Sequence, residues 1–229
     1  MVIAPHPDDA VLGAAGVIQR AQRQGWRIVA AHMTHGDAFT LSTWRMRHHT
    51  QPADYLAMGH LRRKEAETAL RVLGVQPQDC VFFGFPDGRL GQLSTAPLTS
   101  PFTHCARDPY AESPSFGQPY TYAQWATSVQ QMVTAYQPAM VVYPDAADTN
   151  ADHRATGQLL HQLTPNRPTL TYRVHGRHLP QPAAHSALSL TPQEQSRKQL
   201  AIRLHPSQVA VTGWWLAGFA RPTEPFASR

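Results

Sequence analysis

The feature that most constrains the fold is a regular alternation of short apolar runs with longer segments of helical periodicity. The runs of strand length lie at 2–5, 27–33, 80–83, 139–143 and 169–174. Helices are predicted at 9–24, 54–73, 120–136, 152–163 and 191–204. Apolar residues recur every three or four positions in the first two, and the last begins with Thr-Pro-Gln-Glu, a good helix start. Strands that alternate with helices predict an α/β fold with a mostly parallel sheet, because each helix returns the chain to the same edge of the sheet.

We expect one domain over residues 1–229, with a Rossmann-like sheet flanked by helices on both faces. Three stretches lack a clear period and are predicted as irregular loops over the carboxyl ends of the strands: 35–53, 84–119 and 175–190. Long irregular segments inside a compact domain are often functional. The last residues, 221–229, are predicted as a loose tail.

Composition excludes several classes of protein. With 42% apolar and 15% charged residues, the chain is predicted to be globular. Its apolar runs are too short for a transmembrane helix, and it does not begin with a secretory signal, so we expect a cytoplasmic protein without a membrane span. Two cysteines cannot form a disulfide scaffold. The net charge is +5, but no basic run exceeds Arg62-Arg63-Lys64, which argues against a nucleic-acid partner.

A histidine and two carboxylates follow the first predicted strand, in the segment Pro5-His6-Pro7-Asp8-Asp9. In an open parallel sheet, ligands bind outside the carboxyl ends of the strands. Imidazole nitrogen and carboxylate oxygen are ligands that zinc accepts, and a catalytic zinc usually has three protein ligands and one open position. The alternative is structural, because Asp8 or Asp9 could simply cap the helix that follows.

A second polar cluster follows the fourth predicted strand, between Asp145 and Arg154. His153 could complete a metal site with His6 and Asp9, which would leave Asp8 free as the general base that deprotonates a metal-bound water. Asp152 would then orient a nearby imidazole; alternatively, it only caps the helix.

These motifs, in this order, resemble the LmbE-like (PIG-L-type) zinc-dependent N-deacetylases. That family includes N-acetylglucosaminyl-phosphatidylinositol deacetylases, deacetylases of the mycothiol and bacillithiol pathways, and glycopeptide-antibiotic deacetylases. The Pro-His-Pro-Asp-Asp segment is the most specific match. Individually weaker matches lie at 34–37 (Thr-x-Gly-Asp), 62–65 (Arg-x-x-Glu), 84–88 (Gly-x-x-Asp-Gly), 198–208 and 219–226.

The resemblance covers most of the chain and implies a role for each matched residue. It implies that His6, Asp9 and His153 bind Zn²⁺ and that Asp8 is the general base. It also implies that Arg62 and Asp87 bind substrate. The structural alternatives are an exposed Arg62–Glu65 pair on one helix face and a turn-forming Asp87.

One position departs from the family pattern. The family's second metal motif usually reads His-Pro-Asp-His, whereas this chain has Asn150-Ala151-Asp152-His153. Asn150 can donate a hydrogen bond to an oxyanion, but it cannot act as an acid. Asp8 could then return its proton to the leaving amine, or an imidazole from elsewhere could serve, among them His35, His104 and His205.

The predicted function is removal of an N-acetyl group from an N-acetylglucosaminyl-type small molecule, with zinc or another divalent metal as cofactor. One alternative is a catalytically impaired, differently specific or purely binding protein, as a result of Asn150. Another is a two-metal phosphoester hydrolase, for which Asp145 and Asp148 supply further carboxylates. A homo-oligomer is compatible with all of these.

Overall fold

The computed structural model describes all residues of the chain except 49, 177–184 and 229. Within this part of the chain, one seven-stranded sheet has the order β3-β2-β1-β4-β5-β7-β6. Its strands are β1 (Val2–Ala4), β2 (Ala30–His32), β3 (Cys80–Phe82), β4 (Val141–Pro144), β5 (Thr169–Tyr172), β6 (His185–Ser189) and β7 (Thr223–Ser228). Strands β1 to β5 are parallel, whereas β7 pairs antiparallel with both β5 and β6. The predicted mostly parallel α/β sheet is confirmed.

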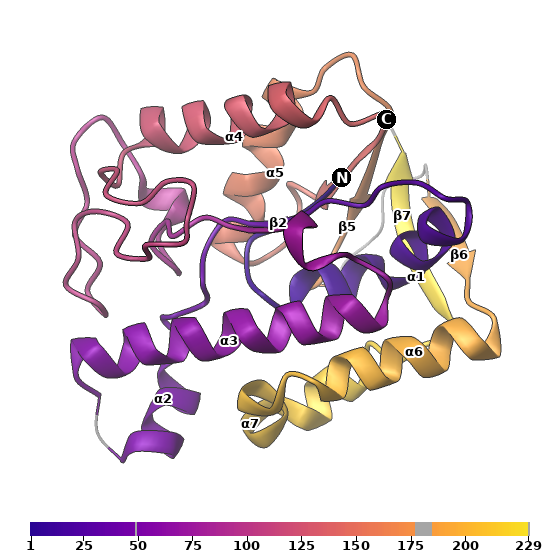
Figure 1. Ribbon diagram of the computed structural model, residues 1–229, viewed down its shortest axis with the longest axis horizontal. Helices are drawn as coiled ribbons and strands as arrows, with labels where there is room; N and C mark the ends of the chain where they lie inside the picture. Colours follow the sequence, from indigo (N-terminus) through magenta and orange to yellow (C-terminus); the bar gives the residue numbers. More distant parts are fainter. Residues whose placement is uncertain (49, 177–184, 229) are drawn as a thin grey trace.

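Helices cover both faces of the sheet (Figure 1). They are α1 (Asp9–Arg23), α2 (Thr40–Arg47), α3 (Pro52–Val72), α4 (Tyr122–Tyr136), α5 (Ala151–Leu163), α6 (Pro192–Arg203) and α7 (Pro206–Ala217). Two short 3-10 helices precede and follow β3, at Pro77–Asp79 and Leu90–Gln92. The five helices predicted from the sequence therefore form within three residues of their expected ends.

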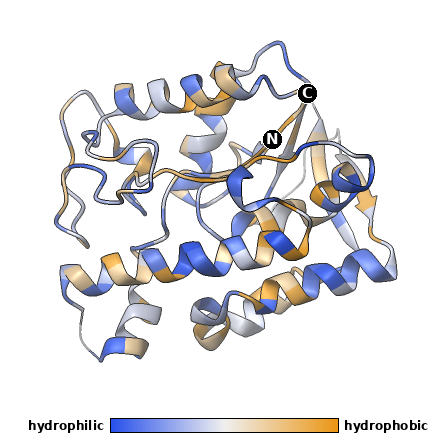
Figure 2. Cartoon of the chain, in the orientation of Figure 1, coloured by the Kyte–Doolittle hydropathy of each residue, from blue (hydrophilic) through white to orange (hydrophobic). Residues whose placement is uncertain are grey.

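The sheet separates two hydrophobic cores. Val2 and Ala4 of β1 pack in a core with α1, α3 and α6, whereas Ile3 between them packs in a core with α4 and α5. This division follows from the alternation of side chains along a strand. Because both faces are covered, the central strands β1 and β4 are hydrophobic along their whole length, and Figure 2 shows the hydrophobic centre of the sheet.

Four elements were missed by the sequence prediction. The stretch 35–53 contains helix α2, and helix α7 lies beyond the last predicted helix. The stretch 175–190, where described, ends in strand β6. The prediction of a loose tail at 221–229 was wrong, because Thr223–Ser228 forms strand β7. None of these segments has a clear local period, and the strands depend on pairing with distant segments.

Glu224 of strand β7 forms a buried ion pair with Lys198 of helix α6, and both residues contact helix α1. The Nζ of Lys198 donates to Oε1 of Glu224 at 2.6 Å and to the Leu12 carbonyl oxygen at 3.0 Å. The backbone N–H of Gly16 donates to Oε2 of Glu224 at 2.9 Å. Between these two backbone groups, Ala14 leaves helical dihedral angles (φ −140°, ψ 16°). The ion pair therefore bonds to the backbone where α1 bends, which explains how Glu224 is accommodated in a buried strand.

Candidate metal centre and active site

The polar side chains that follow different strands converge at the carboxyl ends of the parallel strands, around one cavity of about 600 Å³. The loop after β1 brings His6 and Asp8, the first residue of α1 is Asp9, and Asn150 caps the start of α5 after β4. All of these line the cavity. His153 lies just behind them and is completely buried.

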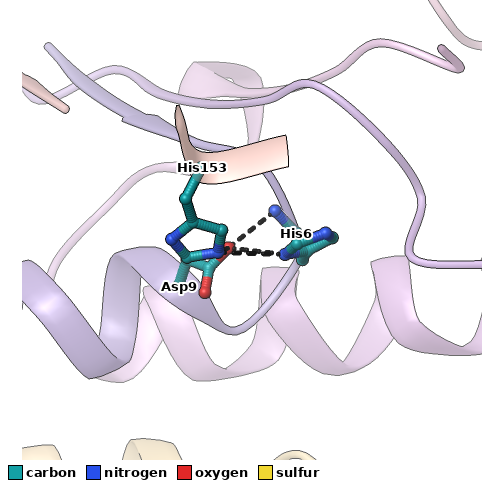
Figure 3. A group of neighbouring side chains, drawn as sticks. All are labelled: His6, Asp9 and His153. Atoms are coloured by element: carbon teal, nitrogen blue, oxygen red, sulfur yellow. Dashed lines mark hydrogen bonds and ion pairs between the residues drawn. The ribbon is translucent and has the colours of Figure 1, made fainter. Parts of the chain in front are cut away.

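Three side chains direct one ligand atom each to a common point (Figure 3). The Nδ1 of His6 lies 2.9 Å from Oδ2 of Asp9, and Nε2 of His153 lies 3.1 Å from the same oxygen. The two imidazole nitrogens are 3.3 Å apart. The loop after β1 supplies His6, the first turn of α1 supplies Asp9, and the first turn of α5 supplies His153. The structure thus brings together the three residues predicted to bind a metal.

In each imidazole, the outer nitrogen, which is the one that points away from the common point, faces a carboxylate. Nδ1 of His153 lies 3.1 Å from Oδ2 of Asp148. Nε2 of His6 lies 3.2 Å from Oδ1 of Asp87 and 3.4 Å from Oδ2 of Asp152. A carboxylate at the outer nitrogen holds the proton there and leaves the inner lone pair free for a metal. The donor set and its surroundings therefore fit a divalent metal such as zinc.

The charges in this group are strongly coupled. Burial lowers the pKa of His6, but the charge of Asp9 and hydrogen bonds to Asp152 and Asp87 outweigh burial and raise that pKa well above its ordinary value. The pKa of His153 is likewise raised to about 9 against the effect of burial, by Asp9 and Asp148. Burial alone would raise the pKa of Asp9, yet His153 and His6 hold it well below its usual range. Asp9 is therefore ionised, and its negative charge stabilises a positive charge next to it.

Asp8 points to a different set of partners, although it is adjacent to Asp9 in the chain. Its Oδ1 accepts from Nη2 of Arg62 at 3.2 Å, and its Oδ2 accepts from Nε2 of Gln208 at 2.7 Å. Asp8 occupies the N-cap position of α1, but its side chain forms no cap hydrogen bond. The alternative of a simple helix cap is therefore wrong for the Asp8 side chain.

Arg62 is buried and is not part of an exposed pair with Glu65. Its Nη1 donates to the Gly36 carbonyl oxygen at 2.6 Å. Gly36 has a φ of +68°, and a Cβ at this position would collide with the Arg62 guanidinium. Glu65 instead accepts from the backbone N–H of Ser207 at 2.9 Å and from its hydroxyl at 2.6 Å, which docks the start of α7 on α3.

Asp87 also lines the cavity, and its Oδ2 accepts from the Ala38 backbone N–H at 2.7 Å. Burial would raise the pKa of Asp87, but the hydrogen bond and charge of His6, together with Arg62, lower it. Asp87 and Arg62 lie on the same cavity wall as the metal group, where the resemblance places substrate contacts.

Asn150, rather than Asp152, caps helix α5. The Oδ1 of Asn150 accepts from the backbone N–H groups of Asp152 at 2.9 Å and His153 at 3.3 Å. Its Nδ2 is therefore the end of the amide that can donate to a ligand. Asp152 accepts from the backbone N–H groups of Gly88 at 2.7 Å and Leu90 at 3.0 Å, so it fastens the loop after β3 to α5 beside His6.

The imidazoles named as substitutes for the family's histidine do not line the cavity. His35 and His205 are both buried, and His35 stacks on Tyr110 with ring centroids 3.6 Å apart. His104 lies in the long loop before α4 and has a positive φ. The sequence assigned no site role to Gln208 or His175. It offered Asp148 as a ligand for a second metal but not as the partner of His153.

Asp145 and Asp148 do not supply ligands for a second metal in the described part of the chain. Oδ2 of Asp148 accepts from the backbone N–H groups of Val174 at 2.9 Å and His175 at 3.0 Å as well as facing His153. Asp145 lies beside Arg173, at 3.8 Å. Among the described residues, a second group of candidate ligands consists of Asp87, Asp152 and the outer nitrogen of His6. Because that nitrogen carries the proton when Nδ1 binds a metal, the two carboxylates are acceptors for His6.

The fold and the site together define an α/β protein with a buried His/Asp/His group at the carboxyl ends of its strands. The sequence model of the PIG-L family, described as GlcNAc-PI de-N-acetylase, matches residues 1–164. The chain therefore belongs to the PIG-L family. No curated protein matches in a direct sequence comparison.

Solved structures of several activities share this fold. N,N′-diacetylchitobiose deacetylase from Pyrococcus horikoshii is 20% identical with a TM-score of 0.68, and the match covers 100% of this chain and 82% of that chain. A deacetylase of teicoplanin biosynthesis is 18% identical with a TM-score of 0.66, over 100% and 97%. GalB, the 4-carboxy-2-hydroxymuconate hydratase from Pseudomonas putida KT2440, is 16% identical with a TM-score of 0.63, over 100% and 93%. At these identities the likeness shows the fold alone.

Among the described residues, no helix combines the length and the apolar character that crossing a membrane requires.

Proposed function

We propose that this protein is a zinc-dependent N-deacetylase that removes the acetyl group from an N-acetylglucosaminyl-type small molecule. The observation that carries the proposal is the convergence of His6, Asp9 and His153 on one point, with the separately held carboxylate of Asp8 at the same open cavity. The PIG-L family match supports the reaction. We keep zinc as the metal because two imidazoles and one carboxylate suit it, although another divalent ion would fit the same ligands.

When bound, zinc would polarise the amide carbonyl and increase the acidity of a water molecule. Asp8 accepts the proton of the attacking water, because its carboxylate faces the cavity next to the three proposed ligands. Arg62 and Gln208 each occupy one oxygen of Asp8 and hold its carboxylate in one orientation. Each oxygen retains a lone pair for the water.

The remaining steps concern the charge on the carbonyl oxygen and the leaving amine. Nδ2 of Asn150 donates a hydrogen bond toward the developing oxyanion. The C–N bond then breaks, its electron pair stays on nitrogen, and Asp8 returns the proton to that nitrogen. The products are acetate and a free amine. Arg62 and Asp87, which line the same cavity, hold the sugar hydroxyls.

The test is acetate release from N-acetylglucosamine and a panel of its glycosides, with zinc content measured on the same protein. Asp8→Asn should keep zinc and lower kcat by about 10²–10⁴-fold, since it removes the general base. Asp9→Asn is the matched control: it changes the adjacent carboxylate in the same way, but should lose zinc as well as activity.

Two results would contradict the proposal in different ways. Full turnover by Asp8→Asn would overturn the assignment of the base. Wild-type protein that binds one zinc and the sugar but releases no acetate would favour the alternative of a protein impaired by Asn150, and Asn150→His should then restore turnover. Hydration of an unsaturated acid, tested in parallel because GalB shares the fold, would place the protein in another reaction class.

A further inference from the structure

His175 is a cavity residue that the proposed mechanism does not use. It lies three residues after the end of β5 and lines the same cavity as His6, Asp8, Asp9 and Asn150. The sequence prediction placed it at the start of an irregular loop and assigned it no role. Its position beside the metal group depends on the pairing of β5 with β4.

One backbone contact and two ring contacts hold His175 in place. Its backbone N–H donates to Oδ2 of Asp148 at 3.0 Å, and that oxygen also faces Nδ1 of His153. Its ring stacks on Trp215 with centroids 5.2 Å apart and planes 22° apart. Its ring also lies edge-on to His153, at 4.9 Å and 83°. The ring is therefore pre-positioned next to a proposed zinc ligand.

The ring nitrogens of His175 are available to a ligand. Neither of them has a hydrogen-bond partner among the residues that the structure describes, although the ring is packed on both Trp215 and His153. The imidazole carries at least one N–H donor, whichever ring nitrogen holds the proton.

We propose that His175 is a catalytic residue that donates a hydrogen bond to the oxygen of the scissile carbonyl as the carbon becomes tetrahedral. The carbonyl must reach the metal group to react, and His175 adjoins that group through His153. Its N–H would act together with Nδ2 of Asn150, because the Oδ1 of Asn150 is already committed to the cap of α5. This inference rests on the proposed deacetylase function, and it assigns a second donor to a site whose family motif has lost a histidine.

The test compares two replacements of His175, one that removes its hydrogen-bond donor and one that removes its ring. His175→Phe keeps a flat ring to stack on Trp215 but removes the donor, whereas His175→Gln keeps a donor and removes the ring. We expect His175→Phe to lower kcat for acetate release by about 10²-fold with little change in KM, as for loss of one oxyanion donor. His175→Gln should retain more activity than His175→Phe. His161→Phe, an exposed histidine in the last turn of α5, is the matched control.

A purely structural role predicts the opposite order, with His175→Phe closer to the wild type than His175→Gln, and that order would overturn the inference. A higher KM at unchanged kcat would also overturn it, because His175 would then bind the sugar and not the reacting oxygen. Zinc content of each variant must equal that of the wild type for the kinetic comparison to apply.

A binding measurement tests the same point in variants that lose part of their folded population but keep their zinc. The methylphosphonamidate of glucosamine has a tetrahedral phosphorus with a charged oxygen, whereas glucosamine itself has neither. We expect His175→Phe to weaken binding of the phosphonamidate about 10²-fold relative to glucosamine, and an unchanged ratio would overturn the inference. If the wild type releases no acetate from any amide, the proposed function itself fails, which is a different outcome from an active wild type with an equally active His175→Phe.

Discussion

Replacement of Asp148 by asparagine tests whether the carboxylate behind His153 prepares that imidazole for zinc. Oδ2 of Asp148 faces three donors, namely Nδ1 of His153 and the backbone N–H groups of Val174 and His175. Oδ1 accepts from the backbone N–H of Asn150 at 2.9 Å. In Asp148→Asn the amide oxygen can serve the three donors, but the NH₂ group must then face the N–H of Asn150.

Two losses follow from that arrangement. The N–H of Asn150 loses its acceptor, which should lower the free energy of unfolding by about 1–3 kcal/mol. Nδ1 of His153 then faces a neutral oxygen in place of an anionic one, so His153 becomes a weaker zinc ligand. Loss of such an outer partner typically lowers metal affinity about 10–100-fold, which corresponds to about 1.4–2.7 kcal/mol.

The assay is a zinc titration in competition with a chromophoric chelator at constant pH, combined with urea unfolding of the metal-free protein. Asp145→Asn is the matched control, because Asp145 lies in the same loop but contacts Arg173 and Thr171 instead of the metal group. It should bind zinc as tightly as the wild type. A folded Asp148→Asn protein with wild-type zinc affinity would refute the reasoning, because Asp148 would then not control the proton of His153.

Two further predictions concern the stability of the fold. Lys198→Met leaves Glu224 buried without its cation and should lower the free energy of unfolding by about 3–5 kcal/mol; a urea midpoint equal to that of the wild type would contradict this. Burial opposes ionisation of Glu194, but the Thr191 backbone N–H and Arg20 lower its pKa to about 2 from 4.5. Ionised Glu194 therefore contributes fully to the free energy of unfolding above pH 4.5, and this contribution is lost as the pH falls toward 2. In Glu194→Gln the free energy of unfolding should fall less steeply with pH across that interval. The same pH dependence as in the wild type would contradict this prediction.

The residues of the candidate metal group and Asp8 could be predicted from the sequence because they follow strand ends. His6, Asp8 and Asp9 follow β1 directly, and His153 follows β4, so the chain order of a parallel sheet already places them at one edge. The structure brings all four to that edge. Their individual roles stay predictions until zinc binding and turnover are measured.

The residues that support this group could not be predicted from their position after a strand. Gln208 reaches Asp8 across 200 positions of sequence, from a helix that has no clear period, and Glu65 fixes that helix through Ser207. Strand β7 contains Glu224 and Pro225, which are poor strand residues, and it forms because β5 and β6 supply its hydrogen-bond partners and Lys198 pairs with its buried charge.

The sequence by itself determined the alternation of strands and helices, the parallel centre of the sheet and the edge at which chemistry can occur. These features depend on local periodicity and on the short range between a strand end and the next helix start. Only the tertiary structure decided which carboxylate faces which imidazole, which group holds Asp8 and that His175 lines the cavity. Such contacts join side chains from segments far apart in the chain, and their geometry is set by how helices and strands pack, which no local pattern of residues encodes.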